Sequence, residues 1–137
     1  MGRLLGIDYG TRRIGIAVSD PLKIIASPHS VIDRKKTPDY LSALKELIVS
    51  LEIESIVVGL PYNMKGKASA QTNSVLEFIS EIREKLKLDI QTTDERLSSK
   101  SAEDTLRLKG ISSSRNRSEV DKTAAAIILQ EFLDTQR

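Results

Sequence analysis

The 137-residue sequence predicts an α/β fold built on a mixed five-stranded sheet, with elements in the order βββαβαβαα. Three segments with strand-like patterns come first, and strand and helix patterns then alternate to the end of the chain. Short turns between the first strands favour antiparallel pairing, whereas intervening helices favour parallel pairing. We therefore expect antiparallel strands in the first half, parallel strands in the second, and helices flanking the sheet.

The first three strands are predicted close together. Arg3 to Ile7 is short and apolar and runs into a turn, and Arg13 to Ser19 alternates well enough for a second strand. The turn between them is short, which predicts an antiparallel hairpin. Lys23 to Ile32 is the third expected strand, and Pro28 limits it to an edge or an irregular end.

A helix and a buried strand are expected next. Thr37, Pro38 and Asp39 form a helix start, with a capping hydroxyl, a proline at the first position and an acid in the first turn. Apolar residues then recur at helical spacing to Leu51. Ser55 to Leu60 is β-branched and apolar, which is typical of a buried parallel strand.

The second half alternates helices and a strand. An apolar stripe from Val75 to Leu86 predicts a helix, and Leu88 to Thr93 predicts a strand. Ser98 to Leu108 predicts a modest helix, and Val120 to Leu133 a final one. No repeat or linker divides the sequence, so we expect one domain over residues 1–137.

Composition excludes several kinds of site. The chain has no cysteine and one histidine, which rules out disulfides and leaves little scope for a zinc site or a histidine-based triad. No apolar run approaches the ~20 residues that cross a membrane, and a signal-peptide pattern is missing, so we expect a cytoplasmic protein. The net charge is only +2, but residues 96–122 hold seven basic and four acidic residues. A solvated surface is the simplest interpretation of that excess alone.

Acidic residues stand where predicted elements begin or end. Asp8 follows the first strand, where it either projects from the sheet edge or caps a turn. Asp94 and Glu95 follow a later strand, and strand alternation lets only one of them face a given site. Asp121 lies at the start of the last helix, as part of a capping box from Ser118 or as an inward-facing carboxylate.

Three acids in a chain almost without histidine favour a hard divalent cation, Mg²⁺ or Mn²⁺, because these ions prefer oxygen ligands. A pair of such ions can cleave a phosphodiester, by activating water and by taking up charge on the leaving oxygen. The acids alone therefore favour a divalent-cation site of a kind that can serve phosphodiester hydrolysis.

Four blocks of sequence, in order, resemble the YqgF family of pre-16S rRNA nucleases and RuvX-like Holliday junction resolvases. The resemblance spans nearly the whole chain. The first block is Gly6-Ile7-Asp8-Tyr9-Gly10 with Arg13-Ile14-Gly15 and Ser19-Asp20, and the second is Val57-Val58-Gly59-Leu60-Pro61 with Asn63-Met64 and Gly66. The third is Asp94-Glu95-Arg96-Leu97, and the fourth is Asp121-Lys122 with Ala124-Ala125 and Leu129-Gln130.

The resemblance implies a ribonuclease H-like fold and a nuclease with two Mg²⁺ or Mn²⁺ ions. By position, it implies that Asp8, Glu95 and Asp121 are the catalytic metal ligands, with Asp94 as a neighbouring group. The implied reaction is hydrolysis of phosphodiesters in processing the 5′ end of pre-16S ribosomal RNA, with resolution of branched DNA as the alternative.

Basic residues near these acids are candidates for binding substrate phosphates. Arg13 could equally anchor the hairpin, and Arg96 could pair with its acidic neighbour. The full set of candidates is Arg13, Arg96, Arg115, Arg117 and Lys122.

Two other classes of protein fit part of the sequence. The segment from Gly6 to Thr11 resembles the phosphate-binding hairpin of sugar kinases and actin-like ATPases, but those proteins need two such domains to clamp a nucleotide. A non-catalytic module that binds structured RNA or branched DNA is the other rival. Junction resolution normally needs a symmetric dimer, and the sequence fits a monomer or a homodimer.

Overall fold

The computed structural model describes residues 2–61, 69–94, 104 and 117–136. Five strands form one sheet in the order β3-β2-β1-β4-β5, with β1–β2 and β2–β3 antiparallel and β1–β4 and β4–β5 parallel. This confirms the predicted mixed sheet. The strands are β1 (Arg3–Tyr9), β2 (Arg13–Ser19), β3 (Ala26–Asp33), β4 (Ile53–Leu60) and β5 (Asp89–Asp94).

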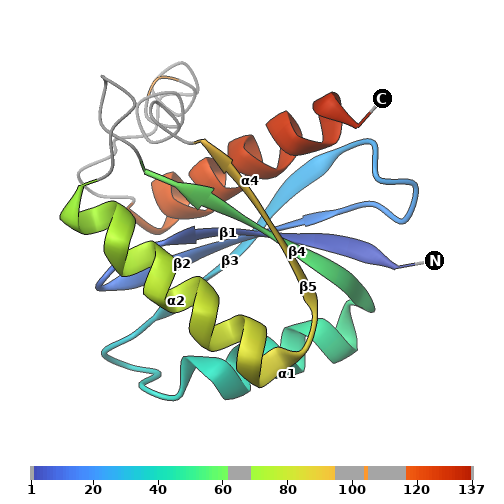
Figure 1. Cartoon of the computed structure of the whole chain (residues 1–137). Helices are drawn as coiled ribbons and strands as arrows, with labels where there is room; N and C mark the ends of the chain where they lie inside the picture. Colours follow the sequence, from blue (N-terminus) through green and yellow to red (C-terminus); the bar gives the residue numbers. More distant parts are fainter. Residues whose placement is uncertain (1, 62–68, 95–103, 105–116, 137) are drawn as a thin grey trace.

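Helices cover both faces of the sheet (Figure 1). Helices α1 (Tyr40–Ser50) and α2 (Ala70–Leu86) lie on one face, and α4 (Arg117–Thr135) lies on the other. The helix expected at 98–108 lies outside the described residues, apart from the helical Asp104. None of the helices described is long and apolar enough to cross a bilayer.

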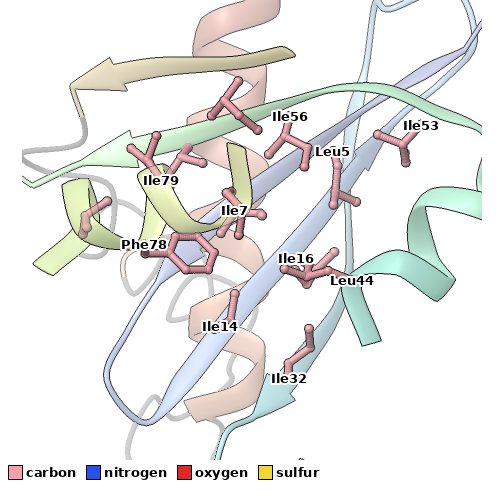
Figure 2. Close-up of a cluster of buried hydrophobic side chains, with 14 of the residues drawn as sticks. Leu5, Ile7, Ile14, Ile16, Ile32, Leu44, Ile53, Ile56, Phe78 and Ile79 are labelled. Carbon is pink, nitrogen blue, oxygen red and sulfur yellow. The ribbon is translucent and has the colours of Figure 1, made fainter. Parts of the chain in front are cut away.

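The larger core lies between the sheet and the α1/α2 layer (Figure 2). Alternation along β1 and β2 sends Leu5, Ile7, Ile14 and Ile16 to this side, and all four are fully buried. The intervening residues of both strands therefore face α4, where Leu4 and Ala17 join a second core with Ala125, Ile128, Leu129 and Leu133. Opposite faces of the same strands thus serve two different helical layers.

Two glycines let α4 lie unusually close to the sheet. A Cβ atom at Gly6 would come within 2.7 Å of the Cβ of Leu129, and one at Gly15 would overlap the backbone carbonyl of Asp121. Any larger residue at either position would push the helix outward. The backbone of α4 near Asp121 is therefore fixed against β2.

The third strand begins three residues later than the sequence predicted. The carboxylate of Asp20 accepts hydrogen bonds from the amides of Ile24 and Ile25, at 2.7 and 2.9 Å. These bonds hold residues 20–25 in a turn, so β3 starts only at Ala26. The expected start at Lys23 is wrong.

The starts of α1 and α4 also differ from the starts that the sequence predicted. Asp39 is itself the N-cap of α1, because its carboxylate accepts from the amide and the hydroxyl of Ser42. The prediction of Thr37 as the cap is therefore wrong. Helix α4 already includes Arg117 and Ser118, so Ser118 is not its cap and Asp121 lies beyond the first turn.

Candidate functional site

The carboxyl ends of the parallel strands β1, β4 and β5 share one edge of the sheet. Register pairs Ile7 of β1 with Val58 of β4, and Leu60 of β4 with Asp94 of β5. The antiparallel β2 begins at the same edge with Arg13. Residues that close these strands therefore meet there.

Asp8 and Asp121 come together through a glycine. Asp8 lies two residues beyond Gly6 on β1, which places it on the face that α4 covers. Its partner across the β1–β2 pairing is Gly15, and the carbonyl of Asp121 lies against that glycine. The backbones of two acidic residues separated by more than a hundred residues thus lie at the same part of the sheet.

Arg13 forms an ion pair with Asp121. Its Nε donates to Oδ2 of Asp121 at 2.5 Å, and the two side chains are 30% and 22% exposed. The guanidinium therefore lies at the half-buried carboxylate and compensates its charge. The sequence had left a phosphate contact and a hairpin anchor equally open for Arg13, and the structure adds this ion pair.

The third predicted acid, Glu95, lies outside the described residues, as do Arg96 and Arg115. Its neighbour Asp94 ends β5. Burial, followed by the charges of Asp94 and Asp134, raises the pKa of Glu131 on α4 above its ordinary value. Asp94 is therefore close enough to α4 to act on a carboxyl group of that helix.

Among the residues placed in the structure, no three histidine or acidic side chains form a group that could hold a metal ion. The pair of Asp8 and Asp121 supplies oxygen donors of the kind that Mg²⁺ and Mn²⁺ prefer. The donor set fits such an ion once a further ligand is added.

Two more predicted phosphate-binding residues lie on α4. Arg117 is the exposed first residue of the helix. Lys122 forms an ion pair with Glu119 one turn earlier, with 2.8 Å between Nζ and Oε1. Neither side chain shares a described contact with Asp121, but both lie within a turn or so of it along the helix.

A cavity of about 470 Å³ adjoins Asp121. Residues 9–13 of the β1–β2 turn line one wall, and the first two turns of α2 line another. Arg12 and Arg13 give this cavity a basic character. A cavity of this size therefore lies beside one of the candidate acids.

Arg34 holds the β1–β2 turn from outside the predicted site. Its Nη1 donates to the hydroxyl of Tyr9 at 2.7 Å and to the carbonyls of Gly10 and Thr11 at 3.4 and 3.2 Å. Its guanidinium also lies about 5 Å from the ring centres of Tyr9 and Tyr40. The sequence analysis missed this residue, which stands in an exposed-looking run of charges after β3.

Tyr9 and Tyr40 connect that arginine to α2. The ring of Tyr9 stacks on Phe78, with centroids 4.2 Å apart, and the hydroxyl of Tyr40 donates to Glu81. Burial and then that hydrogen bond raise the pKa of Tyr40 to about 12. The turn bearing Arg12 and Arg13 is therefore fixed to the α1/α2 layer.

Comparison with known proteins gives consistent matches over nearly the whole chain. A family model described as "RuvX: Holliday junction resolvase" matches residues 2–135. A protein of Syntrophomonas wolfei named "Putative pre-16S rRNA nuclease" is 44% identical over 132 residues, which cover 96% of this chain and 94% of the relative. A protein of Desulforamulus reducens with the same name is 41% identical, with 97% of each chain covered.

Solved structures with low sequence identity share the fold. The RuvC protein of Thermus thermophilus, solved in complex with a Holliday junction substrate, matches with a TM-score of 0.60 at 15% identity, covering 99% of this chain and 96% of that one. A fowlpox virus resolvase solved with Holliday junction DNA matches with a TM-score of 0.61 at 9% identity, covering 98% of both chains. The ribonuclease H-like fold predicted from the sequence is confirmed.

Proposed function

The chain belongs to the RuvX family, as its sequence blocks predicted, and on that premise we propose that it is a nuclease that hydrolyses nucleic-acid phosphodiesters with the help of divalent cations. The observation that carries this proposal is that Asp8 pairs with Gly15 and that the backbone of Asp121 lies against the same glycine. The proposed cations are two Mg²⁺ or Mn²⁺ ions, because the donors are carboxylate oxygens.

In the proposed mechanism, Asp8, Glu95 and Asp121 are the catalytic residues and hold the cations. Bound ions of this kind supply an activated water and stabilise the charge of the leaving oxygen. Arg13 orients the carboxylate of Asp121 through the bond from its Nε and keeps its other guanidinium nitrogens for a substrate phosphate.

The remaining basic residues hold the phosphates of the substrate further from the cut. We assign this role to Arg96, Arg115, Arg117 and Lys122. Lys122 is already paired with Glu119, so a phosphate must compete with that carboxylate for its ammonium group. Each such contact would make substrate binding more sensitive to salt.

The proposed substrate is structured RNA at the 5′ end of the 16S ribosomal RNA precursor. Relatives 36–44% identical to this chain are named "Putative pre-16S rRNA nuclease". Trimming a precursor requires a single active site, which the chain can supply as a monomer. Action on a ribosomal RNA precursor would place the protein in the cytoplasm.

Resolution of Holliday junctions is the second candidate, and the description of the matching family favours it. Two coordinated cuts on a junction require two active sites, which normally means a symmetric dimer. A non-catalytic nucleic-acid-binding module is the third candidate. It differs from both nucleases in cleaving nothing under any metal condition.

Cleavage assays separate these candidates. The purified chain is incubated with a transcript covering the 5′ end of the 16S precursor and with a four-way DNA junction, with Mg²⁺, with Mn²⁺ and with a chelator. We expect metal-dependent cleavage of the RNA by the wild type and none by Asp8→Asn. Asp89→Asn is the matched control that keeps activity, because Asp89 begins β5 and so lies at the opposite end of that strand from Asp94 and the candidate site. Cleavage that survives Asp8→Asn, or no cleavage of either substrate, contradicts the proposal.

A further inference from the structure

The cavity beside Asp121 has features that the acids alone do not explain. Its volume of about 470 Å³ lies within the range of small-molecule sites. One wall is the β1–β2 turn with the exposed side chains of Thr11 and Arg12, and the facing wall is α2, with Gln71 and Ser74. With Arg13, which also lines it, the cavity therefore offers two guanidiniums, the hydroxyls of Thr11 and Ser74, and an amide around one space.

The walls of this cavity are held in place by other contacts. Arg34 binds the carbonyls of Gly10 and Thr11, and its own amide donates to the carbonyl of Arg12 at 2.9 Å. On the opposite side, Thr72 donates to the carbonyl of Pro61 at 2.6 Å, which ties the first turn of α2 to the end of β4. A ligand would therefore meet a preformed site and would not have to order it.

We propose that this cavity binds one unpaired nucleotide of the substrate strand, next to the phosphate that is cut. The proposal rests on the proposed nuclease function. In it, Arg12 contacts the backbone phosphate, while Gln71 and Ser74 hydrogen-bond the sugar or the polar edge of the base. Asp121 lines the same cavity, so a nucleotide bound there is adjacent to the candidate acids.

The shape of the space favours one strand over two. A double helix is far wider than a cavity of this volume, whereas a single splayed nucleotide can enter it. A second cavity of about 270 Å³ shares Tyr9, Thr11 and Ser74 with the first, so the depression continues along α2.

Placing a large side chain in the cavity tests the proposed nucleotide site directly. Ala70 is the exposed first residue of α2 and lines the cavity, whereas Asn73 is exposed on the same helix and lines neither described cavity. Ala70→Trp and Asn73→Trp add a similar bulk inside and outside the proposed site. Both are made in the Asp8→Asn background so that bound nucleic acid stays uncut.

Binding is measured by fluorescence anisotropy with labelled single strands of about 12 nucleotides, as RNA and as DNA, and with the corresponding duplexes. We expect Ala70→Trp to weaken single-strand binding at least about tenfold, and Asn73→Trp to change it less than about twofold. A loss with RNA alone, or with RNA and DNA alike, supports the proposal and identifies the sugar that the cavity accepts. Equal binding by the two variants, or no single-strand binding by the parent, overturns it.

A second, milder pair of variants distinguishes a loss of binding from a folding defect in Ala70→Trp. Gln71→Ala removes an amide from the cavity, and Asn73→Ala removes one outside it. We expect a several-fold loss of binding for Gln71→Ala alone, as for one hydrogen bond. If the wild type cleaves RNA but both pairs bind alike, the nucleotide site is wrong and the nuclease function stands. If nothing is cleaved, the proposed function fails whatever these variants bind.

Discussion

The Nε of Arg13 lies 2.5 Å from Oδ2 of Asp121 and joins the start of β2 to α4 across 108 residues of sequence. This ion pair closes a chain of contacts in which Asp8 pairs with Gly15 and Gly15 supports the backbone of Asp121. The geometry of the candidate site therefore depends on a glycine and an arginine as much as on its acids.

Replacing Arg13 by glutamine should weaken substrate binding far more than it lowers stability. The ion pair is partly exposed, so its loss should cost about 1 kcal/mol or less of unfolding free energy. Loss of a phosphate contact should instead weaken substrate binding and reduce the slope of log Kd against log salt concentration by about one. Binding titrations at several salt concentrations measure the slope. Lys45→Gln on the far helix α1 is the control, and an unchanged slope in Arg13→Gln would remove Arg13 from the phosphate contacts.

Gly15→Ala should displace α4 from the sheet. The new methyl group would overlap the carbonyl of Asp121, so the helix must move or the strand must bend. We expect the unfolding free energy to fall by about 1–3 kcal/mol, as for an overpacked core, and nuclease activity to fall as Asp121 shifts. Chemical denaturation and a cleavage assay check the two effects. A variant with wild-type stability would show that α4 does not need this close approach.

Arg34→Met should loosen the β1–β2 turn. The substitution keeps an apolar stem between the rings of Tyr9 and Tyr40 but removes the charge and the bonds to two turn carbonyls. We expect a loss of about 2 kcal/mol in unfolding free energy. Lys36→Met, an exposed cation two residues later, should change stability little. Equal thermal midpoints for the two variants would contradict the role assigned to Arg34.

Tyr40 should make stability depend on alkaline pH. Its pKa in the fold is about 12, above the ordinary value of 10.0, because burial and the bond to Glu81 favour the neutral phenol. A group with a raised pKa contributes fully below its unfolded pKa and loses that contribution as pH rises through the folded value. The stability of the wild type should therefore decline between about pH 10 and 12. Tyr40→Phe should show a shallower decline in denaturation experiments over that range, and an identical decline would count against this role.

The sequence predicts the sheet and its helices well because their signals are local. Alternation and helical spacing in segments such as Ser55 to Leu60 and Val75 to Leu86 follow directly from which face is buried. The starts of β3 and α1 were misplaced because side chains decided them. Asp20 and Asp39 bind nearby amides and thereby set where β3 and α1 begin.

The candidate site was only partly predictable, because its geometry depends on contacts between residues that lie far apart in the sequence. Asp8 and Asp121 were identified because they stand at the ends of predicted elements. The need for glycine at position 15 depends on a helix that lies far away in the sequence. Arg34 is likewise indistinguishable, in sequence, from the lysines that follow it. Glu95 lies outside the described residues, so its place in the site stays a prediction.

Isothermal titration of Mn²⁺ into the protein tests most directly whether these carboxylates hold divalent cations. We predict saturable binding by the wild type and by Asp89→Asn, and a loss of at least about tenfold in affinity for Asp8→Asn and for Asp121→Asn. Wild-type affinity in both of these last two variants would show that the cations bind elsewhere and would contradict the account.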